Sequence, residues 1–120
     1  MNGISFKRTM CIIWFNHPRV LEFLIEHGEV YTLRGHLKKC TGHVVILSRY
    51  GYKAYGVVRL IKVIDLKEPS ELEVFVDKSG FRTIEEWLSA FRELNGDVNT
   101  AYLYYVKIEK PLLDRLRHYL

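Results

Sequence analysis

The chain has 120 residues, of which 48% are hydrophobic and 27% charged, with only two cysteines. These are ordinary values for one globular domain with its own core, and they exclude a disulfide-rich scaffold. The longest early apolar run, Met10 to Phe15, has six residues, which is too short for a membrane span or a signal-peptide core. We therefore expect a cytoplasmic protein with reduced cysteines and no membrane partner.

The positive charge is unevenly distributed along the chain. Residues 1–70 carry 11 Lys or Arg against 5 Asp or Glu, whereas residues 71–120 carry 7 against 9. Residues 31–62 contain seven Lys or Arg and no acidic residue. This pattern favours a basic face and a polyanionic partner, although a solvated surface with scattered cations would give the same composition.

The first third of the chain reads as strand, helix and strand. Alternation predicts an edge strand within residues 1–9 and a buried or strand-like run over residues 10–15. A helix is expected to begin at Pro18, with Asn16 or His17 as its cap, and to end at Gly28. A short strand over residues 29–34 and a basic loop over residues 35–42 follow.

The centre of the chain predicts a long hairpin. Residues 44–47 form an apolar run rich in β-branched side chains, and residues 49–53 contain a Gly that favours a turn. The second strand, over residues 54–66, is apolar on both faces. We therefore expect it to be covered on both sides, as in a small closed or strongly curved sheet.

The last third contains the clearest helix signal. Residues 71–76 alternate in a way that allows a strand or a short helix. Thr83 and Glu86 have the spacing of a capping box, and the helix that they begin should end at residues 95–96. A long strand over residues 101–109 and a helical amphipathic tail over residues 110–120 complete the chain.

This order of elements predicts an α+β fold. Few connections are long enough for parallel crossovers, so the sheet should be curved and mostly antiparallel, with two or three flanking helices. Residues 1–120 should form a single domain with its core over residues 4–109. The apolar side of the tail should dock on this domain, and it could also support a weak homodimer.

Several stretches resemble the ASCH domain of the PUA-like superfamily of small β-barrels. They are the opening residues Ile4-Ser5-Phe6-Lys7-Arg8, the run Thr32-Leu33-Arg34 after a helix that ends at Gly28, the strand entry Thr41-Gly42-His43-Val44-Val45, the helix start from Ser79-Gly80-Phe81 to Glu85-Glu86-Trp87, and the aromatic strand Tyr102 to Ile108. The resemblance covers residues 4–109 and implies a barrel whose cleft handles RNA or a nucleoside-like ligand.

Some relatives in this family hydrolyse acylated cytidine with a Lys, a Thr and a Glu. Here the Thr position is Thr32, but the Lys position holds Glu29, and the Glu position falls near Ser79 with Asp77 as the nearest carboxylate. Amide hydrolysis needs an activated nucleophile and a group that stabilises the carbonyl oxygen. Because two of the three groups are missing, the sequence argues against this activity. A nucleoside amidohydrolase or a weak ribonuclease, using Thr32 with Lys53 or Lys39, is kept as the alternative function.

The function that we expect first is RNA binding. Arg34 can fork onto a phosphate or a base edge, or it can pair with Glu29 or Glu26 at the barrel mouth. Cations interleaved with aromatic rings suit single-stranded nucleic acid, because charge follows the backbone and rings stack on bases. The candidate contacts are Lys7, Arg8, Arg34, His36, Lys38, Lys39, Arg49, Tyr50, Tyr52 and Lys53.

Neither a metal nor a cofactor is expected. The spacing of His36, Cys40 and His43 is tolerable for zinc, but a fourth ligand would have to come from a distant part of the chain. Trp14 and Trp87 are interpreted as core residues.

Overall fold

The computed structural model describes residues 11–111, with side chains up to Lys110. Lys7, Arg8, the strand predicted within residues 1–9 and most of the predicted tail lie outside the described residues.

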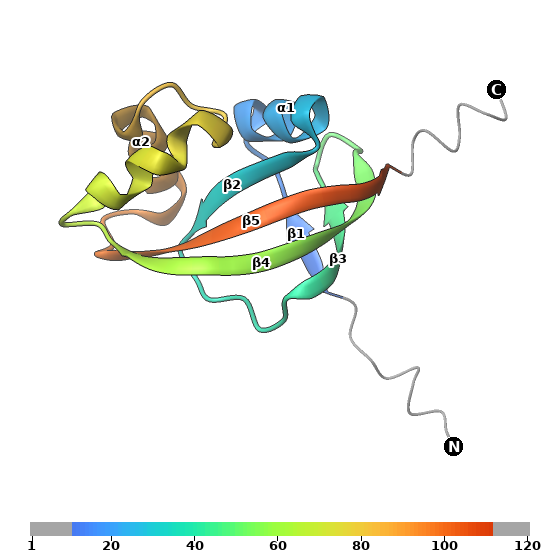
Figure 1. The fold of residues 1–120 in the computed structure, drawn as a ribbon, viewed down its shortest axis with the longest axis horizontal. Coiled ribbons are helices and arrows are strands. Elements are labelled where there is room, and N and C mark those ends of the chain that lie inside the picture. The colour runs from blue at the N-terminus through green and yellow to red at the C-terminus, as the bar shows by residue number, and fades with distance from the viewer. Residues whose placement is uncertain (1–10, 112–120) are drawn as a thin grey trace, which may run out of the picture.

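Five strands form one curled sheet that makes half a barrel (Figure 1). The sheet order is β1-β3-β4-β5-β2, with β1 parallel to β3 and the other neighbours antiparallel. The predicted α+β class with a curved, mostly antiparallel sheet is confirmed. The strands are β1 (Ile12–Trp14), β2 (Glu29–Arg34), β3 (Gly42–Leu47), β4 (Lys53–Asp65) and β5 (Thr100–Pro111).

The helices lie along one side of the long strands in Figure 1. The predicted start and end signals are confirmed for both α-helices: His17 caps the first, which Gly28 ends in a left-handed conformation with φ 78°, and Thr83 caps the second. Two short 3₁₀ segments precede the second α-helix. The helical elements are α1 (Pro18–His27), η2 (Pro69–Val74), η3 (Val76–Lys78) and α2 (Ile84–Asn95).

The core fills the inside of the curl. Val106 of β5 pairs with Val30 of β2 on one side and with Val58 of β4 on the other, so their side chains project to one face. All three are fully buried, as are Ile46 and Tyr104. Alternation along each strand thus directs one set of side chains into the core and the other set outward.

Side chains, rather than backbone pairing, join the two edge strands of the sheet. The Arg34 guanidinium, at the end of β2, donates through Nη1 to the Trp14 carbonyl of β1 over 2.8 Å. Lys38 Nζ donates to the Ile12 carbonyl of the same strand over 2.8 Å. These two bonds lie two residues apart on β1 and bring its free edge against the end of β2 and the loop that follows.

A disulfide between Cys11 and Cys40 adds a covalent link at the same place, with Cα atoms 5.9 Å apart. The expectation of two reduced cysteines is therefore wrong. The sequence count excluded a disulfide framework but could not reveal that the curl of the sheet brings two cysteines 29 residues apart into bonding distance.

Two further expectations need correction, and one open alternative is decided. The outer face of β4 is not covered: Tyr55 is 44% exposed, because the described helices leave this part of the sheet open. Residues 71–76, for which a strand and a short helix were both open, are helical: η2 ends at Val74 and η3 begins at Val76, with Phe75 between them. Strand β5 extends to Pro111, so the first two residues of the predicted helical tail belong to the sheet.

Candidate nucleic-acid interface

A cleft of about 500 Å³ lies between the connection from β1 to α1, the end of β2, and α2. Its walls combine aromatic rings with polar and charged side chains, which is the usual composition of a site that binds a ligand with both apolar and charged parts. The aromatic residues that line it are Trp14, Phe15, Phe81, Trp87 and Phe91, and the polar ones include Asn16, His17, Arg34, Arg49, Glu93 and Asn95.

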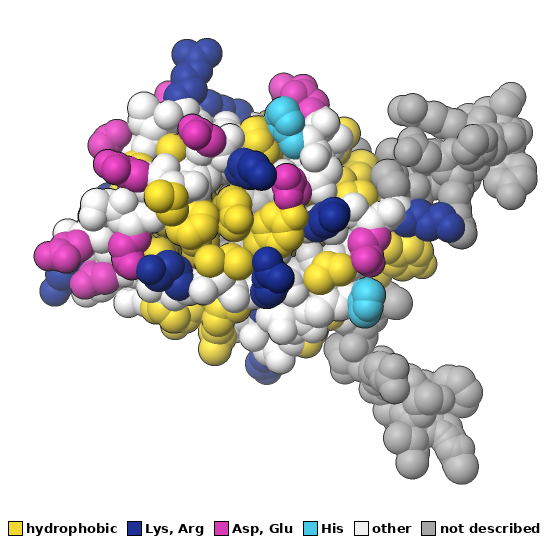
Figure 2. Space-filling model, viewed as in Figure 1, with side chains coloured by type: hydrophobic (Ala, Val, Ile, Leu, Met, Phe, Trp, Pro, Cys, Tyr) yellow, Lys and Arg dark blue, Asp and Glu magenta, His cyan; other side chains and the backbone are white. Residues whose placement is uncertain are grey.

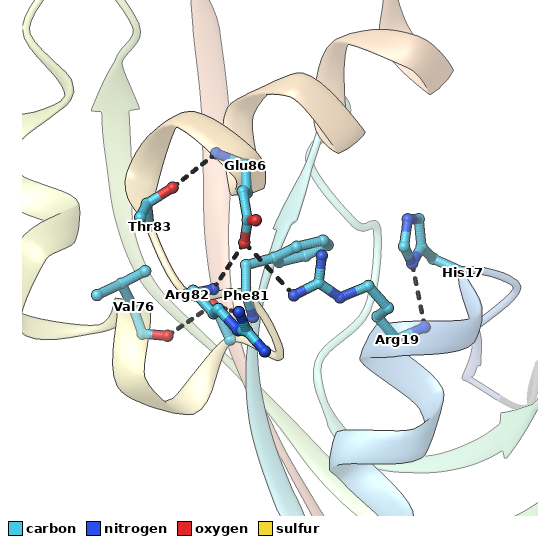
Figure 3. Close-up of polar contacts among 8 residues, drawn as sticks. His17, Arg19, Val76, Phe81, Arg82, Thr83 and Glu86 are labelled. Carbon is cyan, nitrogen blue, oxygen red and sulfur yellow. Dashed lines mark hydrogen bonds and ion pairs between the residues drawn. The ribbon is translucent and has the colours of Figure 1, made fainter.

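One arginine holds α1 and α2 together beside this cleft (Figure 3). Arg19, in the first turn of α1, places its guanidinium 4.9 Å from the Phe81 ring centroid and 3.4 Å from the Glu86 carboxylate in α2. Both members of the ion pair are half-exposed, so solvent screens the attraction between them. The stacked ring adds a contact that orients the two helices.

The capping box predicted for α2 forms in modified geometry. The Thr83 hydroxyl accepts from the Glu86 backbone N–H over 3.1 Å, as expected. The Glu86 carboxylate accepts a hydrogen bond of 3.0 Å from the backbone N–H of Arg82, the residue before the cap. This backbone hydrogen bond is the main reason why the pKa of Glu86 lies below its usual value.

His17 caps α1 and faces the cleft. Its Nδ1 accepts from the Arg19 backbone N–H over 3.3 Å, and its ring meets the Phe81 ring edge-on with centroids 5.3 Å apart. Burial lowers the pKa of His17, and the nearby Arg19 lowers it further, whereas Glu93 opposes the shift. The imidazole is thus kept neutral, as the cap requires.

Arg34 is the central cation of the cleft. Besides its bond to Trp14, its Nε donates to the Thr32 hydroxyl over 3.3 Å, and its guanidinium lies 4.7 Å from the Phe15 ring centroid. Burial lowers the pKa of Arg34 to about 10, which still leaves it charged at neutral pH. Within residues 11–110, no carboxylate lies within ion-pair distance of it, so the alternative pairing with Glu29 or Glu26 does not form.

The groups of the alternative enzyme do not come together. Thr32 lines the cleft, but it is 6% exposed and its hydroxyl already accepts from Arg34. Lys53 stands exposed at the start of β4 and does not line the cleft. Glu29 projects to the outer face of the sheet, where it accepts from Tyr105 and Lys78. Ser79 is buried and donates to the Val76 carbonyl.

In the basic loop after β2, Lys38 contacts other parts of the fold, whereas His36 and Lys39 face solvent. The Lys38 backbone N–H donates to the Tyr104 hydroxyl over 2.7 Å while its ammonium binds β1. Burial, and then the charge of Arg34, lower the pKa of Lys38. His36 and Lys39 are exposed. Lys38 is thus engaged in closing the sheet, whereas His36 and Lys39 remain accessible.

The hairpin between β3 and β4 contributes one residue to the cleft. Arg49 lines it, and its backbone N–H donates to the Asn16 side chain over 2.8 Å. The Arg49 guanidinium also stacks on the exposed ring of Tyr50, 5.2 Å from the centroid. Tyr52 is only 9% exposed and packs in the core, which leaves little ring surface for a base.

Trp14 is the cleft residue that the sequence interpretation placed wrongly. We expected it in the core with Trp87, but Trp14 is 49% exposed and lines the cleft, whereas Trp87 is 3% exposed. The burial of β1 alternates, with Ile13 inward and Ile12 and Trp14 outward. The sequence carries no such alternation, because residues 10–15 are all apolar, so it gave no signal for the open face of this strand.

The histidine–cysteine spacing does not produce a metal site within the described residues. Cys40 is bonded to Cys11, and residues 11–110 contain no cluster of three or more potential ligands.

The comparisons with known proteins identify no relative: no protein-family model, curated protein or solved structure matches this chain. Over residues 11–111, no helix is long and apolar enough to cross a membrane.

Proposed function

We propose that this protein binds RNA through the cleft between β2 and α2, as a module of the ASCH and PUA-like type. The observation that supports this most is Arg34, a partly buried guanidinium at the cleft without an acidic partner in residues 11–110. A charge in such a place is costly unless an anion or a hydrogen-bond acceptor compensates it. Thr32 and the Trp14 carbonyl accept from two of its donors, and a phosphate group can accept from the others and also neutralise the charge.

The surroundings of Arg34 support a nucleotide rather than a bare anion. Trp14 offers a half-exposed ring at the same cleft, and base–aromatic stacking contributes about 1–3 kcal/mol per base. Arg49 adds a second cation, and the amides of Asn16 and Asn95 line the same walls. The arrangement therefore offers separate places for a phosphate and a base.

The alternative of a nucleoside amidohydrolase or ribonuclease has less support. It needs an activated nucleophile, but the Thr32 hydroxyl is bonded to Arg34, and Lys53 lies away from the cleft. Binding without turnover is thus the function that we put forward.

RNA binding is best placed in the cytoplasm, where disulfides are rare. The Cys11–Cys40 disulfide would be unusual in that compartment and would fit an oxidising one. Alkylation of thiols in freshly lysed cells, followed by mass spectrometry, would separate the two cases: two alkylated cysteines fit the cytoplasm, and a protected pair argues for an oxidising compartment.

The test is fluorescence anisotropy with a labelled single-stranded RNA at two salt concentrations. Affinity should fall as salt rises, because bound phosphates release counterions. Arg34→Lys keeps the charge but loses the fork, and a lost hydrogen bond to a charged group should weaken binding roughly tenfold or more. Trp14→Leu, which removes the exposed ring, should weaken it by about tenfold.

Arg92→Gln is the matched control, since Arg92 is exposed on α2 and does not line the cleft. Because Arg34 also contacts Trp14, the melting temperature of each variant must be recorded with its affinity. Arg34→Lys and Trp14→Leu variants that fold and bind as tightly as the wild type would contradict the proposal, as would affinity that does not change with salt.

A further inference from the structure

A second surface, on the outer face of the sheet, combines aromatic rings with cations. Tyr31 of β2 pairs with Tyr105 of β5, and Arg59 of β4 pairs with the same Tyr105. Cross-strand partners project to the same face, so these three side chains form a row across three neighbouring strands. In the adjacent row, Glu29 of β2 pairs with Lys107 of β5.

The rings of this surface contact one another continuously. The Tyr31 and Tyr105 centroids are 5.3 Å apart, and Phe75, between η2 and η3, meets Tyr31 edge-on at 4.9 Å. The Arg59 guanidinium lies 5.5 Å from the Tyr105 centroid. All three rings are half-buried and Arg59 is exposed. We call Tyr31, Phe75, Tyr105, Arg59 and Lys107 the outer patch.

The Tyr105 ring is held in a fixed orientation. Its hydroxyl donates to the Glu29 carboxylate, which also accepts from Lys78 over 3.1 Å. The hydrogen bond to Glu29 is the main cause that raises the pKa of Tyr105 to about 12, so the hydroxyl remains a neutral donor. The fixed Tyr105 ring packs against the Tyr31 ring and restricts it, so Tyr31 loses little entropy when a base stacks on it.

The charge on this face is suited to an anionic partner. Glu29 pairs with Lys78 and also interacts with the charge of Lys107, which lies opposite it in the sheet, but within residues 11–110 no carboxylate lies within ion-pair distance of Arg59 or Lys107. Figure 2 shows hydrophobic side chains gathered over the middle of this face, with Lys and Arg as well as Asp and Glu side chains placed around them. Rings surrounded by unpaired cations are the arrangement that single-stranded nucleic acids use, with bases on the rings and phosphates on the cations.

We propose that the outer patch is a second binding surface for single-stranded RNA, separate from the cleft. Bases stack on Tyr31 and Phe75, and phosphates bind Arg59 and Lys107. The inference goes beyond the cleft proposal and does not depend on it, because the outer patch and the residues that line the cleft have no member in common.

The test uses the full chain and a fluorescein-labelled oligouridine of about 12 nucleotides, a length within the range that such surfaces cover. In Arg59→Gln/Lys107→Gln, the negative slope of log affinity against log salt should become shallower by about 1.4, since each phosphate contact on a single strand contributes about −0.7. Tyr31→Leu should weaken binding about tenfold without a change in slope, because it removes stacking and no charge.

The charge-matched control is Lys67→Gln/Arg92→Gln, two exposed cations that belong to neither surface. Ultraviolet crosslinking of the same oligonucleotide uses the wild-type protein, so its result cannot be caused by a substitution that impairs folding. We expect crosslinked peptides that contain Tyr31 or Phe75.

The outcomes separate the two proposals. If outer-patch variants bind as the control does and crosslinks map only to the cleft, the outer patch is overturned and the cleft proposal stands. If outer-patch variants weaken binding while Trp14→Leu does not, the cleft proposal fails and the outer patch stands. Absence of any oligouridine binding overturns both.

Discussion

Arg34 shows how one side chain can serve the fold and a ligand. A guanidinium has five N–H donors, and within the described residues Arg34 uses one on Thr32 and one on the Trp14 carbonyl. Arg34 lines the cleft, so a phosphate there can accept hydrogen bonds from the remaining donors. Arg34→Gln would therefore remove a sheet contact as well as the ligand contact, which is why the cleft test uses the charge-conserving Lys variant.

His17 predicts how stability depends on pH. Its folded pKa lies below the usual 6.5, so the unfolded chain takes up the proton first as the pH falls. The stability that neutral His17 contributes is complete above pH 6.5 and is lost progressively as the pH drops below that value. The free energy of urea unfolding of the wild type should decrease over this window, before the carboxylates titrate.

The matched variant is His17→Asn, whose amide oxygen can keep the helix cap but cannot titrate. As the pH is lowered, the unfolding free energy of the wild type should fall relative to that of His17→Asn. His17→Ala should cost about 1 kcal/mol at pH 7 through the lost cap. A difference that is constant from pH 7.5 to 5 would show that this residue is not the sensor.

At the scale of single elements, strands β4 and β5 approach closely at Gly56. A Cβ atom there would lie 2.4 Å from the Lys107 carbonyl oxygen and 2.7 Å from Ile46 Cδ1. Gly56→Ala should therefore destabilise the protein by roughly 1–3 kcal/mol through overpacking. Lys53→Ala, at an exposed position of the same strand, is the control and should remain within about 0.5 kcal/mol of the wild type in urea unfolding. Equal midpoints for the two variants would mean that the strands adjust without cost.

The elements that the sequence predicted well are those set by local chemistry. Pro18 and Gly28 bound α1, Thr83 begins α2, and Gly51, with φ 92°, makes the turn between β3 and β4. Each depends on a backbone preference or a hydrogen bond within a few residues. Such signals are present in the sequence because their partners are neighbours in the chain.

The features that the sequence could not supply depend on distant partners. Trp14 is exposed because β1 is an edge strand whose outer face no described helix covers, and the outer face of β4 is open for the same reason. Lys38 is a good phosphate ligand by residue type, but the curl of the sheet places its ammonium on β1. Among the candidate contacts within the described residues, Arg34 and Arg49 meet at the cleft, whereas Tyr52 is buried.

At the scale of the whole molecule, the disulfide should contribute much of the stability. It closes a loop of 29 residues, for which the chain-entropy model gives about 3–4 kcal/mol. Reduction should lower the melting temperature by roughly 10 °C or more, measured by circular dichroism with and without reductant. Cys11→Ser/Cys40→Ser should melt at the lower temperature under both conditions. A wild type that melts at the same temperature with and without reductant would show that the link carries little of the stability.

The side chains that close the sheet also affect how this protein behaves toward copies of itself. An edge strand with unpaired carbonyl groups is a template on which another chain can add a strand. In β1, the Ile12 and Trp14 carbonyls are already occupied by Lys38 and Arg34, and both occupants carry a positive charge. A second molecule approaching this edge would have to displace two bound cations and meet their repulsion, so within residues 11–110 these two side chains protect the β1 edge from edge-to-edge aggregation.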